Sequence, residues 1–448
     1  MKWVPTKKPV QSPRVLLLLI GLLFSLTLPD ISGSQGPKTF FGPQARTSYE
    51  QGKTFYEQGR YQEAIAAFTR TLDLIPNFAP AFTWRGMTKR RINDYDGALS
   101  DVLRAIELDP QFGFAYFNRG AIKEWRRDLD GALADYEKAI ELTPERDSAV
   151  MSIAYSQRGY IKIIKRDLNG AMADQLKAIE LNPRNEYAFC YRGLVKEKKG
   201  DLMGSLADYN QSLALNPSTN IRAYIYRGML KTKQKDLGGA MADLNKAIEI
   251  DPKVSHGFLH RAAVKKEQRD LGGAVADLNQ AISLDPENPV AYNNRGYLKL
   301  LQKDYTGALQ DVNRAIAMDP RSSMAYKNRG LIHKEKGNLE AAIADFNQAL
   351  DLDPKNRVAY LGRGEAKEGR GDSAGALADY QKALAIDPAN LETAKQVEAL
   401  KSRMALEALS KPRAPETALK KSAPPAKPRP GKIDQLDQME FLPFFGPK

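Results

Sequence analysis

The stretch PVAYNNRGYLKLLQKDYTGALQDVNRAIAMDPRS at residues 289–322 is followed directly by SMAYKNRGLIHKEKGNLEAAIADFNQALDLDPKN at residues 323–356. The two 34-residue stretches share glycine, alanine, aspartate and proline at the same offsets, and eight further copies of the pattern surround them. We number each copy so that its shared proline is position 32. A period of this size is typical of arrays of stacked repeats, so the fold of the chain follows from the fold of one copy.

The ten copies fill most of the chain. Five extra residues, 147–151, separate the third copy from the fourth, and one extra residue separates the fifth from the sixth. Insertions in such arrays occur in the loops between repeats, so we expect a loop or a local break in the stack at 147–151. The copies are predicted at 45–78, 79–112, 113–146, 152–185, 186–219, 221–254, 255–288, 289–322, 323–356 and 357–388.

Each copy has the pattern of two packed helices. Positions 4, 8 and 11, and positions 17, 20, 24 and 27, have helical spacing. Position 8 is glycine in nine copies and position 20 is alanine in nine, so two antiparallel helices can approach closely. The proline at position 32 ends the second helix. Aspartate at position 16 is expected to cap that helix at its start, and these aspartates include Asp94, Asp128, Asp167, Asp201, Asp270 and Asp304.

This pattern resembles the tetratricopeptide repeat over residues 45–388. The resemblance implies an all-α fold, a right-handed superhelical α-solenoid of helix hairpins, in which the first helices line a concave groove that binds peptide segments. Outside the repeats we expect a leader at 1–34, a lead-in at 35–44, a capping helix at 389–409 and a tail at 410–448.

Charged residues at three positions depart from that family pattern. Position 7, usually apolar in the family, is arginine in nine copies, position 23 is aspartate in nine, and position 11 is lysine in eight. The first copy lacks both partners, with Gln51 and Ala67. Pairing between copies would therefore place Arg85 opposite Ala67. We predict instead that each aspartate bridges the arginine of its own copy, with the lysine as a further candidate.

The resemblance also implies that positions 2, 5, 9, 12 and 13 face the groove. Two interpretations stay open for the apolar residues there: a groove for an extended or helical peptide, or packing between repeats. Asparagine at position 6 partly matches the asparagine ladder with which longer arrays hold peptide backbones. The candidate groove residues are Tyr160, Ile163, Ile164, Cys190, Leu194, Ile225, Met229, Leu259, Tyr297, Leu300, Leu301, Leu331, Asn118, Asn294 and Asn328.

Residues suited to catalysis or metal binding are few. His256 and His260 lie four apart on a predicted helix, but nothing adjacent supplies a third ligand, which favours a polar groove face. The single cysteine, Cys190, excludes an intrachain disulfide and is interpreted as a groove or core residue. No nucleophile elbow or phosphate loop is visible. We therefore expect no catalytic residue, no metal and no cofactor.

The net charge of +13 does not favour a nucleic-acid partner. An arginine and a lysine opposite one aspartate recur along the array, and this structural pattern explains much of the excess. No nucleic-acid-binding motif accompanies the charge.

The N-terminus suggests a compartment. Lys2, Lys7, Lys8 and Arg14 precede an apolar run at 15–28, whose 14 residues fall short of the about 20 that span a membrane. Ser32 and Ser34 suit cleavage after residue 34. We expect a signal peptide and an exported protein, periplasmic or extracellular. The alternative is an uncleaved membrane anchor through 15–28.

The C-terminal part changes character twice. Residues 391–409 have a polar face and are predicted to cap the stack, or else to bind a partner. A Pro- and Lys-rich disordered linker follows from residue 410. Apolar residues then gather in the final stretch, which is either a docking peptide for this groove or another protein, or an untidy terminus. They are Leu436, Met439, Phe441, Leu442, Phe444 and Phe445.

Together these features predict a non-enzymatic, exported scaffold that binds a protein or peptide partner in its concave groove. A membrane-anchored subunit of a cell-envelope assembly or secretion complex is the first alternative. An enzyme or metal-dependent factor centred on the seventh repeat is the second.

Overall fold

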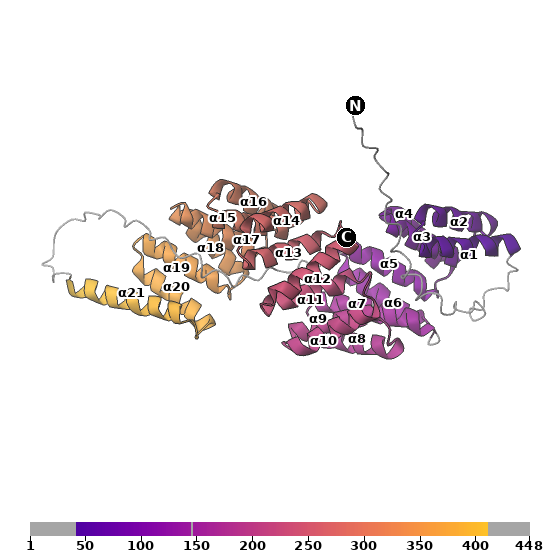
Figure 1. Ribbon diagram of the computed structural model, residues 1–448, viewed down its shortest axis with the longest axis horizontal. Helices are drawn as coiled ribbons and strands as arrows, with labels where there is room; N and C mark the ends of the chain where they lie inside the picture. Colours follow the sequence, from indigo (N-terminus) through magenta and orange to yellow (C-terminus); the bar gives the residue numbers. More distant parts are fainter. Residues whose placement is uncertain (1–41, 145–146, 411–448) are drawn as a thin grey trace, which may run out of the picture. The chain divides into compact units, whose positions relative to one another are not determined.

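The computed structural model describes residues 42–144 and 147–410, and this part of the chain consists of helices joined by short turns (Figure 1). Two helices fall in each of the ten predicted copies, and one helix follows. The two helices of a copy pack as a hairpin, numbered by its copy, except in the sixth copy, where a boundary between two compact units falls within α11. Copy by copy, the helices are α1 (Pro43–Glu57) and α2 (Tyr61–Leu74), α3 (Ala79–Arg91) and α4 (Tyr95–Leu108), α5 (Gly113–Trp125) and α6 (Leu129–Leu142), α7 (Ser148–Ile164) and α8 (Leu168–Leu181), α9 (Glu186–Lys198) and α10 (Leu202–Leu215), α11 (Ile221–Lys233) and α12 (Leu237–Ile250), α13 (Ser255–Glu267) and α14 (Leu271–Leu284), α15 (Pro289–Leu301) and α16 (Tyr305–Met318), α17 (Ser323–Glu335) and α18 (Leu339–Leu352), and α19 (Arg357–Gly369) and α20 (Ser373–Ile386), followed by α21 (Leu391–Ser410).

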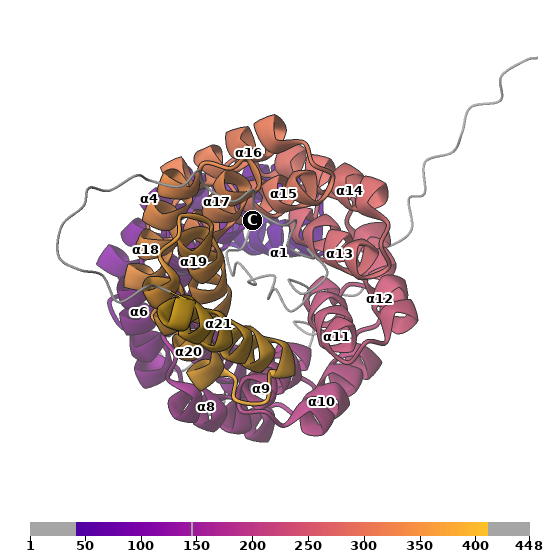
Figure 2. The ribbon, with the colours of Figure 1, turned by 90° about the vertical axis from the view of Figure 1, so that its left-hand side faces the viewer.

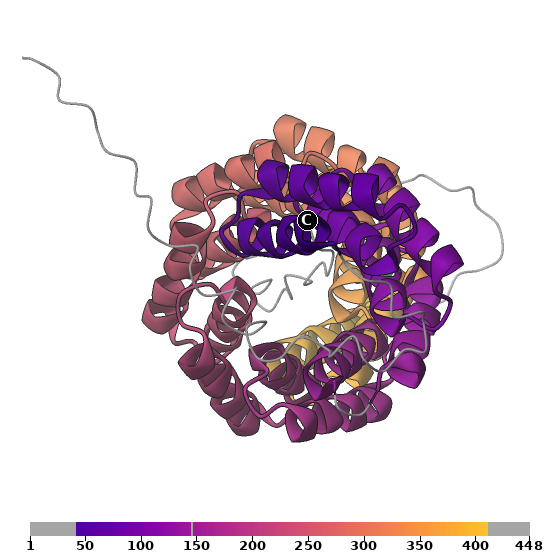
Figure 3. The ribbon, with the colours of Figure 1, turned by 90° about the vertical axis from the view of Figure 1, so that its right-hand side faces the viewer.

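The chain forms two compact units, and the boundary between them falls within α11, after Leu230. In unit 1 the first helices contact one another directly, α3 with α5 and α7 with α9. In unit 2 the same holds for α15 with α17 and for α17 with α19. Figure 2 shows α13, α15, α17 and α19 along the inner side of unit 2, and Figure 3 shows the two layers of unit 1. We call the side of each unit that is lined by the first helices of its copies the inner face of that unit. The predicted all-α solenoid of hairpins is confirmed.

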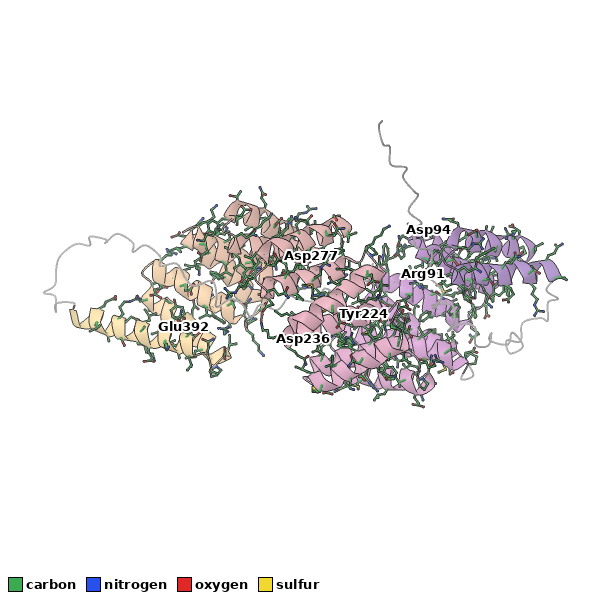
Figure 4. The ribbon with its side chains drawn as sticks, viewed as in Figure 1. Arg91, Asp94, Tyr224, Asp236, Asp277 and Glu392 are labelled. Atoms are coloured by element: carbon green, nitrogen blue, oxygen red, sulfur yellow. The ribbon has the colours of Figure 1, made fainter. Side chains whose placement is uncertain are left out.

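Nine of the ten second helices begin with a side-chain cap, eight of them with aspartate at position 16 and α18 with Asn338, whereas α2 begins after Arg60 without one. The Asp304 carboxylate accepts a hydrogen bond of 2.9 Å from the backbone N–H of Gly307. A Cβ added to Gly307 would lie 2.2 Å from Oδ2 of Asp304, so a larger residue there would force the capping carboxylate to move. Asp94 and Asp236 occupy equivalent places (Figure 4). The remaining caps of this kind are Asp128, Asp167, Asp201, Asp270, Asn338 and Asp372.

Removing one cap should weaken its hairpin measurably. We expect Asp304→Ala to lower the free energy of unfolding by about 1 kcal/mol, because the N–H of Gly307 loses its acceptor. Asp304→Asn keeps an acceptor at the same place and should stay close to the wild type. Urea unfolding followed by circular dichroism measures both. Equal losses in the two variants would show that the cap is not the source of the stability.

The inserted residues 147–151 do not form the expected loop. Ser148 to Met151 extend the first helix of the fourth hairpin, so that α7 has 17 residues where most first helices have 13. The loop prediction is wrong because these residues contain neither glycine nor proline and can continue a helix. The other extra residue, Asn220, caps α11: its Oδ1 accepts from the N–H of Ala223 at 3.2 Å.

The last helix covers the end of the array. Val397 and Leu400 of α21 are buried against Ala376 and Tyr380 of the tenth hairpin, which fits the predicted capping role. The predicted leader, most of the lead-in and the predicted tail lie outside the described residues. Within 42–144 and 147–410, no helix combines the length and the apolar character needed to cross a bilayer.

Candidate functional site

A buried ion pair joins the two helices of each hairpin in nearly every copy. In the eighth hairpin, Nε and Nη2 of Arg295 donate to the two oxygens of Asp311 at 2.8 and 2.6 Å. Nζ of Lys299 lies 2.8 Å from the same carboxylate, whose side chain is only 6% exposed. The predicted pairing within a copy is thereby confirmed. The same arginine–aspartate pairs are Arg85–Asp101, Arg119–Asp135, Arg158–Asp174, Arg192–Asp208, Arg261–Asp277, Arg329–Asp345 and Arg363–Asp379.

The same arginines also reach the preceding hairpin, which the sequence analysis missed. Nη1 of Arg295 donates to Oδ1 of Asn279 at 2.8 Å, and its guanidinium lies 5.4 Å from the ring centre of Tyr292. The sequence signal was present, because asparagine recurs at position 25. The equivalent bonds are Arg227–Asn210, Arg261–Asn245, Arg329–Asn313 and Arg363–Asn347. The position-7 arginines therefore serve the stack and are not free to bind a ligand.

Most of the candidate groove residues are not exposed. Ile164, Met229 and Leu301 keep partial exposure. The others are buried. The physical reason is the direct contact between successive first helices, which covers positions 5 and 9. Packing between repeats explains these residues, and a role in peptide binding stays a prediction. The buried ones are Tyr160, Ile163, Cys190, Leu194, Ile225, Leu259, Tyr297, Leu300, Leu331, Asn118, Asn294 and Asn328.

The asparagines at position 6 bond to protein groups. Nδ2 of Asn118 donates to the carbonyl of Phe114 in its own helix at 2.9 Å. Nδ2 of Asn328 donates to Oδ1 of Asn293 on the preceding first helix at 2.8 Å. Asn294 Nδ2 and Asn328 Oδ1 are buried with no hydrogen-bond partner in the described part of the chain. These side chains tie α17 to α15 and do not form an open ladder.

The inner face of unit 1 gathers a different set of residues, which we call the Arg–Tyr cluster: Arg90, Arg91, Tyr160, Tyr187, Tyr191 and Arg222. Arg222 of α11 is half-buried, and its Nη1 donates to the hydroxyl of Tyr191. Its guanidinium lies 5.9 Å from the ring centres of Tyr160 and Tyr191, which stack on each other at 4.7 Å. Among the described residues, no carboxylate oxygen lies within 4.0 Å of a guanidinium nitrogen of Arg222, which is the limit for an ion pair.

The other two arginines of the cluster also lack a carboxylate partner among residues 42–144 and 147–410. Nε of Arg90 is buried without any hydrogen-bond partner there. Burial, together with the neighbouring Arg91, lowers the pKa of Arg90. Arg91, labelled in Figure 4, donates from Nε to the hydroxyl of Tyr56 at 2.9 Å. Cationic groups left without an anion on a partly covered face are suited to bind one.

One carboxyl group, Glu124 of α5, interacts electrostatically with Arg90 and Arg222. It is buried and accepts a hydrogen bond of 2.7 Å from the hydroxyl of Tyr136. Burial raises the pKa of Glu124, while Tyr136, Arg222 and Arg90 oppose part of that rise. A carboxyl group whose charge is disfavoured by burial cannot balance three guanidinium groups, so the cluster keeps an excess of positive charge.

The inner face of unit 2 contains an unpaired buried lysine. Lys327 of α17 is 2% exposed and has no ion pair with any described residue. Burial, with a contribution from Lys266, lowers the pKa of Lys327 from 10.5 to about 7. Lys266 itself lies 2.9 Å from Glu267. Folding therefore disfavours the charged form of Lys327 near neutral pH.

This lysine should make stability depend on pH. The unfolded chain binds a proton at Lys327 up to pH 10.5 but the folded chain only up to about 7, so stability is lost as the pH falls through this window. Relative to Lys327→Met, we expect the wild type to gain about 1.4 kcal/mol of unfolding free energy per pH unit above 7. Urea unfolding at pH 7, 8 and 9 measures the difference. Lys336→Met, at an exposed site just after α17, is the control, and parallel profiles for Lys327→Met and the wild type would contradict the prediction.

The seventh hairpin does not assemble a metal site. His260 is buried, and burial, with a contribution from His256, lowers its pKa to about 3. Among the described residues, no group of three His, Cys, Asp or Glu side chains is placed to hold a metal ion. Cys190 is fully buried, and burial raises the pKa of its thiol well above the ordinary value, which makes it a poor nucleophile.

Family models for the tetratricopeptide repeat match the chain at six places, which together cover more than half of it. No curated protein matches the sequence. The matches lie at residues 295–363, 264–303, 49–111, 85–147, 153–185 and 221–254.

Solved structures of such proteins resemble this one. Yeast Tom70 is 16% identical, with 81% of this chain and 97% of that chain covered and a TM-score of 0.43. A tetratricopeptide repeat protein from Parabacteroides merdae is 20% identical, with coverages of 56% and 98% and a TM-score of 0.45. The Cut9–Hcn1 hetero-tetramer of the APC/C contains a chain that is 12% identical, with coverages of 80% and 90% and a TM-score of 0.46. At these identities the likeness says nothing about what the chain binds.

Proposed function

Because the chain belongs to the tetratricopeptide repeat family, we propose that it is a non-enzymatic scaffold that binds a segment of another protein on the inner face of its first helices. The fold itself supports a protein-interaction role, since stacked hairpins expose a long face built from many helices. The partner segment is extended or helical, and its chemistry is set by the side chains that the inner face leaves without partners.

One observation carries this proposal. The position-7 arginine pairs named above place each guanidinium on an aspartate, whereas Arg90 and Arg222 on the inner face have no carboxylate partner among the described residues. A half-buried charge without a counter-charge costs free energy, and an incoming anion recovers part of that cost. The tyrosine rings beside Arg222 add apolar and aromatic contact area. The expected partner is therefore an acidic segment that also contains aromatic or apolar residues.

Peptide display against the purified full chain tests the proposal. We expect enrichment of acidic peptides with aromatic residues, and we expect Arg222→Gln to weaken the best of them about 10-fold or more, because a charge-assisted hydrogen bond contributes about 1.5–3 kcal/mol. Arg104→Gln is the matched control in the same unit, since Arg104 is exposed on α4 and pairs with the exposed Glu107. Failure to enrich any peptide, or equal affinity for the wild type and Arg222→Gln, would contradict the proposal.

We also propose that the scaffold is exported, with residues 1–34 acting as a cleaved signal peptide. The support is the basic stretch followed by the short apolar run at 15–28. Cell fractionation with N-terminal sequencing of the mature protein tests this directly. A mature chain that begins near residue 35 in the periplasmic or extracellular fraction agrees with it. An intact N-terminus in the membrane fraction would favour the anchored envelope subunit instead.

A further inference from the structure

The last 16 residues of the sequence have a chemistry opposite to the rest of the chain. Residues 433–448, IDQLDQMEFLPFFGPK, contain Asp434, Asp437 and Glu440 against the single Lys448, in a chain of net charge +13. The same stretch contains Phe441, Phe444 and Phe445. The preceding linker, 411–432, is basic and rich in proline. Acidic and aromatic residues are thus concentrated in one short segment.

We propose that residues 433–445 of this chain dock on the Arg–Tyr cluster of its own unit 1 and cover the partner-binding face. This inference rests on the proposed function, because the segment would occupy the surface on which a partner protein binds. Residues 433–445 would then be a ligand of that surface, and a partner protein would compete with them for the Arg–Tyr cluster.

Charge complementarity is the first argument. The cluster presents Arg90, Arg91 and Arg222, and the buried Glu124 interacts with the first and last of them, whereas the segment presents three carboxylates spaced three residues apart. Arginine and carboxylate form strong, charge-assisted hydrogen bonds, above all where water is partly excluded. Arg90 supplies a buried Nε that has no partner among the described residues. The segment provides the anions that this face lacks.

Aromatic and apolar contacts are the second argument. The cluster contains the stacked rings of Tyr160 and Tyr191 and the half-buried ring of Tyr187. Leu436 and Met439 alternate with the acidic residues of the segment, and three phenylalanines follow. Aromatic pairs contribute free energy beyond the area they bury. The acidic positions would meet the arginines while the apolar positions meet the tyrosines.

Residues 411–432 tether the segment to the same chain, and 22 residues reach at most about 75 Å when fully extended. A tethered segment acts at an effective concentration of about millimolar where its tether can span the distance to the site, so that weak affinity suffices for occupancy. A partner protein would have to displace the segment, so the apparent dissociation constant for the partner equals the intrinsic one divided by the fraction of uncovered sites.

A labelled peptide tests the proposal on the full chain. The probe is a fluorescein-labelled synthetic peptide of residues 433–448, measured by fluorescence polarisation. The open variant is the full chain with Asp434→Asn, Asp437→Asn and Glu440→Gln. We expect the peptide to bind the open variant about 10-fold or more tightly than the wild type, and more weakly as NaCl is raised. Adding Arg222→Gln to the open variant should weaken binding about 10-fold or more, whereas adding Arg104→Gln should not.

Several outcomes would overturn the inference. Equal peptide affinity for the wild type and the open variant would show that the chain's own segment does not occupy the site. A peptide carrying the same three neutral substitutions that binds equally well would remove the charge argument. Self-association of the wild type that disappears in the open variant would place the segment on a neighbouring copy instead. Each variant must unfold at the same midpoint temperature as its parent chain, because a misfolded variant would also lose binding.

The proposed function fails in a different way. If peptides selected by display bind in an Arg222-dependent manner while the 433–448 peptide does not bind, the scaffold role stands and the self-docking is wrong. If neither kind of peptide depends on Arg222, the Arg–Tyr cluster is not a binding surface and both proposals fall. A preference of the open variant for single-stranded nucleic acid over the peptide would also overturn the docking of this segment.

Discussion

Replacing Asp311 by leucine is expected to lower the free energy of unfolding by about 3–5 kcal/mol, because the change leaves two cations partly buried without their anion. Arg295 and Lys299 both lie within 2.9 Å of this carboxylate, which is 6% exposed. Urea unfolding gives the global value. Hydrogen exchange of α15 and α16 gives the local one, which is needed because long repeat arrays do not always unfold in one step.

A double-mutant cycle identifies the cause of that loss. Arg295→Leu alone should cost less than Asp311→Leu, since Lys299 still pairs with the aspartate. The double variant should lose clearly less than the sum of the two single losses, because two interacting groups are removed together. Losses that simply add would refute the coupling seen in the structure. Arg104→Gln, an exposed pair with Glu107, should change stability by less than about 1 kcal/mol.

Gly86→Val is the second change with a large expected effect, a loss of about 3 kcal/mol. A Cβ at Gly86 would lie 2.9 Å from the backbone carbonyl oxygen of Ala98 and 2.9 Å from Cγ2 of Val102. The backbone oxygen belongs to the facing helix and cannot rotate away, so α3 and α4 must separate. Thermal unfolding monitored by circular dichroism measures the loss.

Gly238→Ala is the matched control for the glycine prediction. Gly238 is also helical, but a Cβ there meets nothing within 4 Å. Alanine should therefore stabilise the chain by about 0.5–1 kcal/mol, because glycine loses more conformational freedom on folding. A destabilising effect at Gly238, or a neutral one at Gly86, would mean that close helix approach does not explain the glycine at position 8.

The hairpins and their internal ion pairs were predictable because each feature recurs along the array. Position 7 is arginine and position 23 is aspartate in the same nine copies. Only pairing within a copy gives each of these arginines an aspartate partner. The inserted residues 147–151 occur once, and a general rule about loops was overridden by helix-forming residues. The sequence could not decide between a peptide groove and packing between repeats for the candidate groove residues, because both roles are compatible with apolar side chains at positions 5 and 9.

The Arg–Tyr cluster could not be found from the repeat pattern. Its members come from the second, fourth, fifth and sixth copies. Arg90, Tyr160 and Arg222 stand at positions 12, 9 and 2, so no shared offset connects them. Only the curvature that brings the first helices together places them on one face. Residues that differ between copies were the informative ones here, and a repeat alignment averages them away.

Each position-7 arginine of unit 2 donates to the asparagine of the preceding hairpin, and this has a consequence for the length of the array. If residues 289–322 were excised as one block, Arg329 would follow the seventh hairpin and meet Asn279 where Arg295 now binds it. Every junction between hairpins in this part of the chain uses the same arginine donor and asparagine acceptor. Insertion or deletion of a whole hairpin would therefore preserve every such hydrogen bond, whereas deletion of a single helix would leave one arginine or asparagine without its partner.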